Sequence, residues 1–294
     1  MRKIAILTDS SCDLPQELAD QYGIDIMSFR ILLDGVDYEE RVSCTASEFY
    51  DKMRAAQGVP STAAITPIQF CAKYAEYVDA GYTDVIHVTI NSEGSSTHNN
   101  AIMAQSLLRE ERPEHHLKIH LVDSHSYSMC FGWYLAEMGR KLQNGAEVRL
   151  VIDEFEEKMR QVEILLGPFS LKQMKKSGRI SAAAAFAGEL LGLRPIISMI
   201  DGKTTVLSKV RGDDKVVPSM LDQCKKRLDG MDLADVEYMI GHTDIDRKDE
   251  LIKAAKKMFG HGPVAVFQLG GVVSANTGPD TVALVFTGKT RTRT

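Results

Sequence analysis

The chain of 294 residues is 44% hydrophobic and 26% charged, with a net charge of −5 and a pI near 5.9. This length predicts two domains, and the mild acidity argues against nucleic acid as a partner. Five scattered cysteines without a Cys-x-x-Cys pair argue against a disulfide framework and a zinc site. The apolar run at the N-terminus is too short for a signal peptide, so we expect a cytoplasmic protein.

Strand and helix signals alternate through the first half of the chain. Residues 4–8 form an apolar strand, and a helix follows as far as Tyr22, ahead of Gly23. Residues 26–38 predict a hairpin that turns at Asp34-Gly35. Two capping boxes, at residues 45–48 and 66–69, start further helices. Strands at 84–90 and 118–123 then alternate with helices at 97–109, 129–143 and 148–161, which predicts an α/β domain with a parallel sheet over residues 1–162.

Short polar turns follow three of these strands, at Asp9, Asn91 and Asp123. Because parallel strands end at the same edge of a sheet, we expect the hydroxyl side chains of these turns to converge on one crevice. The turn at residues 90–98 has the sequence INSEGSSTH and opens into a helix, where amide N–H groups and hydroxyls favour an anion. Taken alone, the same turn is also explained by Ser95 or Ser96 capping that helix.

The second half, residues 163–294, predicts an α+β domain with a mostly antiparallel sheet. A hairpin at 196–209 turns at Asp201-Gly202, and strands at 236–241, 264–269 and 281–287 alternate with helices at 215–228 and 247–259. A very apolar helix is expected at 182–191, and its Phe186 either lines a ligand tunnel or packs in a core. We interpret the segment 270–279, rich in Gly, Ser and Asn, as a loop that either approaches a ligand or only connects elements.

Other groupings give weaker signals. The cluster of His115, His116 and His120 lies in a polar segment and lacks a fourth metal ligand by spacing, so we interpret it as a solvated loop and expect no metal. His242 at a strand end is interpreted as structural. The chain has no Gly-x-Ser-x-Gly elbow, no phosphate-binding lysine loop and no Gly-x-Gly-x-x-Gly, so a nucleotide cofactor is unsupported and we expect no cofactor.

A set of motifs along nearly the whole chain resembles the DegV family. They are DSSCDL at 9–14, the loop at 60–67, INSEGSST at 90–97, VDS at 122–124, KKSGRIS at 175–181, Arg194-Pro195 with Asp201-Gly202, and Gly278-Pro279. Each motif is weak alone, but together and in this order they are specific. The resemblance implies a Rossmann-like N-terminal domain and a FakB-like, fatty-acid-binding subunit of a bacterial fatty acid kinase, with a role in phospholipid metabolism.

The resemblance also implies where a ligand lies. A long-chain fatty acid would occupy a tunnel between the two domains, and a separate kinase subunit would phosphorylate its carboxylate to an acyl phosphate. The carboxylate-binding Thr and Ser correspond to Thr62 and Ser95, and Arg211 matches a basic position near the head group. Ser92, Asn276 and Phe186 complete the expected ligand-binding set, with no catalytic residue of the chain's own. Transient contact with a membrane surface belongs to the same expectation.

Two departures from the family pattern stand out. The loop that usually reads Thr-Ser-Gln-Pro-Ser is here Thr62-Ala-Ala-Ile-Thr66, which loses polar groups but keeps the first Thr. Asn276 replaces the usual His before Gly278-Pro279, and a neutral amide cannot supply the positive charge of a protonated His. Glu93, beside the anion turn, fits a carboxylate site only if its side chain turns outward.

Two other functions compete with the lipid carrier. The same turns could serve an enzyme that acts on a small carboxylated or phosphorylated metabolite, although no general base accompanies Thr62 and Ser95. A surface-interaction protein with a vestigial cleft is the third hypothesis. We therefore predict a non-catalytic carrier of a long-chain fatty acid.

Overall fold

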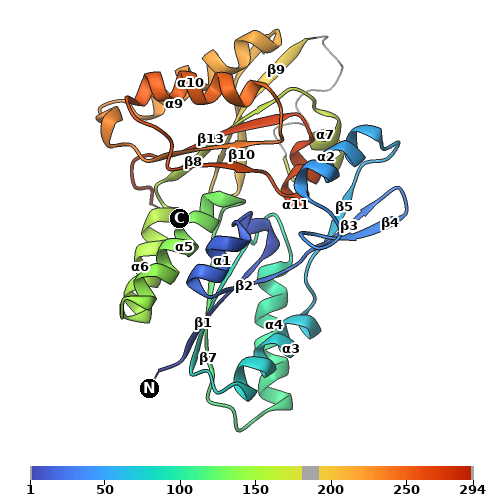
Figure 1. The fold of residues 1–294 in the computed structure, drawn as a ribbon, viewed down its shortest axis with the longest axis vertical. Helices are drawn as coiled ribbons and strands as arrows, with labels where there is room; N and C mark the ends of the chain where they lie inside the picture. Colours follow the sequence, from blue (N-terminus) through green and yellow to red (C-terminus); the bar gives the residue numbers. More distant parts are fainter. Residues whose placement is uncertain (1, 181–191, 293–294) are drawn as a thin grey trace. The chain divides into compact units, whose positions relative to one another are not determined.

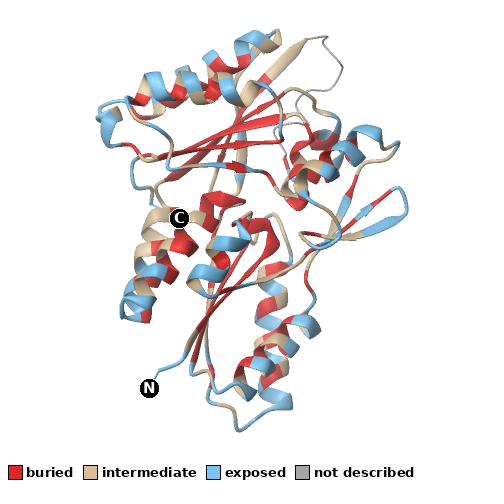
Figure 2. Ribbon diagram, in the orientation of Figure 1, coloured by how far each residue is buried: buried red, intermediate tan, exposed pale blue. Residues whose placement is uncertain are grey.

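In the first half of the chain, four strands form a parallel sheet with the order β2-β1-β6-β7 (Figure 1). Its strands are β1 (Ile4–Asp9), β2 (Ile24–Met27), β6 (Asp84–Thr89) and β7 (Lys118–Asp123). Every residue of β6 is buried, as expected for a parallel strand that is covered on both faces (Figure 2). The predicted parallel α/β architecture is confirmed.

Helices cover both faces of this sheet (Figure 1). They are α1 (Gln16–Tyr22), α3 (Pro67–Asp79), α4 (Thr97–Glu111), α5 (Met129–Gln143) and α6 (Val148–Met159), with a short 3₁₀ turn η1 (Ser10–Cys12) after β1. On one face, Tyr74 of α3 contacts His87 of β6. On the other face, Gly139 lets α5 pack closely against α1 and β1. A Cβ atom at this position would lie 2.7 Å from Cβ of Tyr22 and 3.5 Å from Cδ1 of Ile6.

The described residues, 2–180 and 192–292, divide into two compact units. Unit 1 comprises residues 1–30 and 62–159, and unit 2 comprises residues 31–61 and 160–294. The predicted domain boundary between residues 162 and 163 stays a prediction. The expected apolar helix at 182–191, with Phe186, lies outside the described residues.

The segment 31–61 leaves unit 1 and joins unit 2 before the chain returns. It contains most of β3 (Arg30–Leu33), then β4 (Val36–Glu39), α2 (Ala46–Ala55) and the first residue of β5 (Ser61–Ala63); these strands form a small sheet with the order β4-β3-β5. The predicted turn at Asp34-Gly35 is confirmed, with positive φ at both residues. The prediction of one continuous strand over residues 26–33 is wrong, because β2 ends at Met27 and β3 belongs to a different sheet.

Unit 2 contains a six-stranded sheet with the order β10-β9-β8-β13-β11-β12. Its strands are β8 (Val162–Pro168), β9 (Leu193–Ile200), β10 (Lys203–Arg211), β11 (Tyr238–His242), β12 (Ala265–Gln268) and β13 (Thr281–Thr287). Every pairing is antiparallel except that of β11 with β12, so the predicted mostly antiparallel sheet is confirmed. The β9–β10 hairpin turns at Asp201-Gly202 as predicted, whereas β8 was not predicted as a strand.

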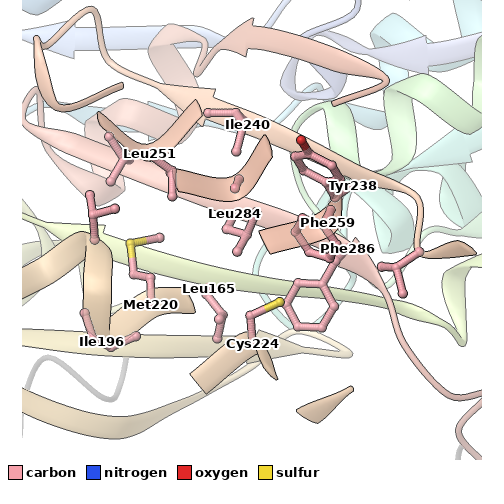
Figure 3. Packing of buried hydrophobic residues seen from close by; sticks show 14 of the residues in the cluster. Leu165, Ile196, Met220, Cys224, Tyr238, Ile240, Leu251, Phe259, Leu284 and Phe286 are labelled. Carbon is pink, nitrogen blue, oxygen red and sulfur yellow. The ribbon is translucent and has the colours of Figure 1, made fainter. Parts of the chain in front are cut away.

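Two amphipathic helices, α9 (Val216–Arg227) and α10 (Arg247–Phe259), pack on this sheet. The side chains of Met220 and Leu251 meet Leu284 and Phe286 of β13 in one buried cluster (Figure 3). The remaining short elements of unit 2 are α7 (Lys172–Ser177), η2 (Asp213–Lys215), η3 (Leu233–Asp235) and α11 (Gly271–Thr277). Among the described residues, none of the helices is long and apolar enough to cross a membrane.

The prediction of a loop at residues 270–279 is wrong, because most of this segment forms the helix α11. Contacts from the 31–61 segment explain this helix. The buried carboxylate of Glu40 accepts a hydrogen bond of 2.7 Å from the N–H of Val272, and the hydroxyl of Tyr50 donates to the carbonyl of Leu269. A negative charge and an acceptor at the first turn of a helix satisfy its unpaired N–H groups, and local sequence does not reveal them.

Candidate functional site

The predicted turns after β1, β6 and β7 lie together at the carboxyl edge of the unit 1 sheet. The buried side chain of Asp9 joins the first two of them. One carboxylate oxygen accepts the N–H of Ile90 at 2.8 Å, and the other accepts the N–H and the hydroxyl of Ser11. Because charge-assisted hydrogen bonds to a buried carboxylate are strong, Asp9 fixes the start of the 90–98 turn.

Asp123 fixes the same turn from the β7 side. Its carboxylate accepts the N–H of Ser92 at 3.2 Å and the N–H of His125 at 2.8 Å, and it lies 3.3 Å from Nδ1 of His125. The amide of Ser92 is therefore already paired with a carboxylate. What Ser92 can offer a ligand is its hydroxyl.

Ser95 lies at the entrance to α4 and is half-buried. Its Oγ accepts the N–H of Thr97 at 3.3 Å and lies 2.8 Å from Oγ1 of Thr97. The adjacent Ser96 is exposed and makes no side-chain cap hydrogen bond. Because a hydroxyl can donate once and accept twice, the pair of Ser95 and Thr97 still has one O–H to donate to an anion while it caps the helix. The capping role and the ligand role are thus compatible.

The charges beside this turn suit an anion. The side chain of Glu93 is exposed, which is the outward orientation that the carboxylate site required. The backbone N–H groups at the first turn of the 15-residue helix α4 carry its partial positive charge toward the Ser95 turn.

Thr62 lies in β5, on the loop that leads into α3, and is half-buried. The predicted capping box of Thr66 and Gln69 is confirmed at the start of α3. Nδ2 of Asn100 in α4 donates to the carbonyl of Ile65 at 2.8 Å, which ties the Thr62 loop to the first turns of α4. The loop with Thr62 and the turn with Ser95 therefore belong to neighbouring helix starts in one unit.

Two histidines lie close to the turns, His87 in β6 and His98 in α4. Nδ1 of His98 lies 2.9 Å from Oγ1 of Thr89, and Nδ1 of His87 lies 2.7 Å from the hydroxyl of Tyr74. Burial, and to a smaller extent the neighbouring His98, lowers the pKa of His87 to about 3. Burial also lowers the pKa of His98, while Asp123 opposes that shift. Both imidazoles are thus expected to be neutral at physiological pH.

The remaining predicted residues fall elsewhere. Arg211 is the exposed last residue of β10, and Asn276 lies in α11, where its Nδ2 donates 2.8 Å to the carbonyl of Val272. Both belong to unit 2, and Phe186 lies outside the described residues. The residues that the structure gathers in unit 1 are therefore Thr62, Ser92 and Ser95.

Sequence reasoning missed the residues that hold the site together. Asp9 and Asp123 were noted only as turn residues, although an Asp that ends a strand before hydroxyl residues is a sign of an acceptor for turn amides. Asn91 was likewise noted only as a turn residue, and Tyr127, which joins it across the second and third turns through a 2.7 Å hydrogen bond, carried no recognisable signal.

Two other histidines have structural partners, and the solvated loop predicted for the 115–120 cluster is wrong for His120, which lies in β7. Nε2 of His120 lies 2.9 Å from the buried carboxylate of Asp84, and Nδ1 of His242 accepts the N–H of Asp244 at 3.0 Å. His116 is exposed. Within residues 2–180 and 192–292, no group of three potential ligands is arranged to hold a metal ion.

Comparison with known proteins places this arrangement in a family. The family model described as uncharacterised protein, DegV family, matches residues 3–289. The chain belongs to the DegV family. A DegV domain-containing protein of Caldanaerobacter subterraneus subsp. tengcongensis is 27% identical over 292 residues, which cover 98% of this chain and all of that protein.

Two solved structures share the fold over nearly the whole chain. A stearic acid-binding protein from Eubacterium ventriosum is 26% identical, with a TM-score of 0.88 over 98% of this chain and 99% of its own. A DegV family protein from Thermus thermophilus, described for its fatty acid binding, is also 26% identical, with a TM-score of 0.81 over 98% of this chain and all of its own.

Proposed function

We propose that this DegV protein binds a long-chain fatty acid, with the carboxylate on the hydroxyl turns of unit 1. The observation that carries the proposal is the pair of Ser95 and Thr97 at the start of α4, which can donate a hydroxyl to an anion. Fatty acid binding by relatives that match this chain over its full length supports the same ligand. Thr62 and Ser92 are proposed to supply further hydroxyls.

The energetics of such a complex divide between tail and head. Burial of a methylene contributes about 0.8 kcal/mol, so a dozen methylenes give on the order of 10 kcal/mol before the costs of binding. The acyl tail, in the tunnel that the family resemblance implies, would therefore supply most of the affinity. The hydroxyl turns would orient the carboxylate.

The finer role that we propose is that of a carrier. The bound carboxylate would be presented to a separate kinase subunit and phosphorylated there to an acyl phosphate. In this role Arg211 and Asn276 would lie near the head group, and Phe186 near the acyl tail. Because Asn276 is neutral, the positive charge near the head group is assigned to Arg211.

The test of ligand binding is a mass-spectrometric analysis of an organic extract from freshly purified protein. We expect a stoichiometric long-chain fatty acid, and a reduced amount in a variant carrying both Thr62→Ala and Ser95→Ala. Ser96→Ala, which removes a neighbouring exposed hydroxyl, is the matched control. Protein that contains no fatty acid, and binds none when it is supplied, would refute the proposal.

The carrier role needs a separate assay. Protein loaded with octadecanoic acid is mixed with a bacterial fatty acid kinase subunit and ATP, and acyl phosphate is trapped with hydroxylamine. Product that depends on both proteins is expected. Fatty acid binding without any product would leave the ligand assignment standing and remove the kinase partnership.

A further inference from the structure

Tyr127, in the loop between β7 and α5, lies directly against the turn that carries Ser95. A Cβ atom added to Gly94 would lie 2.3 Å from the hydroxyl oxygen of Tyr127 and 3.1 Å from two of its ring carbons. Separations under 3.0 Å do not occur for real Cβ atoms, so something must move if residue 94 has a side chain. A side chain at position 94 would therefore displace the Tyr127 phenol from its place against this turn.

The buried Asn91 connects the two turns. Its Nδ2 donates to the hydroxyl of Tyr127 at 2.7 Å, and its N–H donates to the carbonyl of Ser126 at 3.1 Å. Within its own turn, the carbonyl of Asn91 accepts the N–H of Gly94 at 3.2 Å and its Oδ1 accepts the N–H of Glu93 at 3.4 Å. One side chain thus pairs with Tyr127 and with the turn backbone next to Ser95.

We propose that Tyr127 is a positioning residue for carboxylate binding, acting through Asn91 and Gly94 on the Ser95 turn. This inference rests on the proposed function for what Ser95 binds. The phenol ring covers the backbone of Gly94, and its hydroxyl holds the Asn91 amide group that organises residues 91–94. The Ser95 hydroxyl is thereby held in one orientation before the ligand arrives.

The reason that this matters for affinity is preorganisation. A hydroxyl on a turn that samples several conformations must be ordered when the anion binds, and that ordering weakens the complex. Carboxylate binding by Ser95 depends on direction, because the O–H must point at the anion. Burial of an acyl tail has no such directional requirement. A substitution of Tyr127 should therefore weaken binding of the acid and leave binding of an uncharged molecule with the same tail unchanged.

The test compares octadecanoic acid with octadecan-1-ol as probes for wild type, Gly94→Ala, Tyr127→Phe and Tyr127→Ala. Gly94→Ala and Tyr127→Phe should weaken binding of the acid by about tenfold, the size of one charge-assisted hydrogen bond, and change binding of the alcohol by less than about twofold. In the Tyr127→Ala background, Gly94→Ala should have no further effect, because the atoms that its methyl group meets are gone.

Gly139→Ala is the matched control for a tight glycine in the same unit. The added methyl group would lie 2.7 Å from Cβ of Tyr22, near the C-terminal end of α5, whereas the turns precede the N-terminal end of this helix. It should lower thermal stability while leaving the ratio of acid to alcohol affinity as in wild type. A fall in that ratio in Gly139→Ala would show that general destabilisation, and not Tyr127, produces the effect.

Hydrogen exchange in ligand-free protein supplies a second readout. Tyr127→Phe should speed exchange of the amides of Glu93 and Gly94, and leave the amide of Ile90, which is bonded to Asp9, as in wild type. Unchanged exchange at Glu93 and Gly94 would overturn the inference even if no ligand bound, and so would equal losses for acid and alcohol. If wild type bound neither probe, the proposed function would fail while the exchange data still decided the role of Tyr127.

Discussion

His87 should make the stability of unit 1 depend on pH. Its ring is fully buried in β6 and packs against Phe70 and Tyr74, with ring centroids 4.8 and 5.8 Å away. Burial raises the pKa of the Tyr74 hydroxyl, so this hydroxyl stays protonated and donates to Nδ1 of His87. The ring proton therefore lies on Nε2, for which the described residues offer no acceptor. A second proton would create a charge in an apolar environment.

The sign and size of this pH dependence follow from the pKa of His87, which is about 3 in the folded protein and 6.5 in the unfolded chain. Above pH 6.5 neither state carries the extra proton, and the full stability is present. Between pH 6.5 and about 3 the unfolded chain binds a proton that folded His87 does not, so stability falls by about 1.4 kcal/mol per pH unit. Between about pH 7.5 and about pH 5 the loss amounts to about 2 kcal/mol.

The measurement is urea unfolding at these two pH values, followed by the fluorescence of Trp133, the single tryptophan, which lies in α5 of unit 1. His87→Gln keeps an acceptor for Tyr74 but does not titrate, so its stability should fall with acid by about 2 kcal/mol less than that of wild type. Half-buried His98 and buried His242 are present in both proteins, so their own contributions largely cancel in the difference. His116→Gln, at an exposed site, is the control and should retain the wild-type loss. Equal losses in wild type and His87→Gln would refute the assignment.

Four further outcomes are expected. Ser95→Ala should weaken octadecanoic acid binding by about 1–2 kcal/mol in titrations, and Ser96→Ala should not. Asn276→His should leave binding intact and increase acyl phosphate formation with a supplied kinase subunit; an unchanged yield would contradict the expectation that a positive charge at position 276 promotes this step beyond the charge of Arg211. Asp9→Asn, which turns one acceptor oxygen into a donor that faces N–H groups, should lower stability by about 3 kcal/mol in thermal melts. Because the other four cysteines are buried, Ellman's reagent should modify only Cys44 in native protein.

The sequence predicts those parts of the fold that short-range chemistry determines. The capping box of Thr66 and Gln69, the left-handed Gly23 after α1 and the Asp201-Gly202 turn each need only a few adjacent residues, and each appears as predicted. Alternation of strands and helices likewise sufficed for the parallel sheet.

Elements that depend on distant residues escaped prediction. Helix α11 needs the carboxylate of Glu40, more than two hundred residues away, to satisfy its first turn. The same holds for the site. The hydroxyls of Thr62 and Ser95 could be proposed from local pattern and family resemblance, but the carboxylates that orient the turns act across strands. Asn91 meets Tyr127 only because β6 and β7 are neighbours.

The excursion of residues 31–61 into unit 2 also constrains how the chain folds during synthesis. Glu40 and Tyr50 emerge early, yet their partners Val272 and Leu269 are made more than two hundred residues later. At about 5–20 residues per second, the segment must wait on the order of ten seconds or more for its partners. During that interval Phe49 lacks its contact with Gly271, and the hydroxyl of Tyr50 lacks the carbonyl of Leu269. The segment therefore completes its packing only after unit 2 has been made as far as α11.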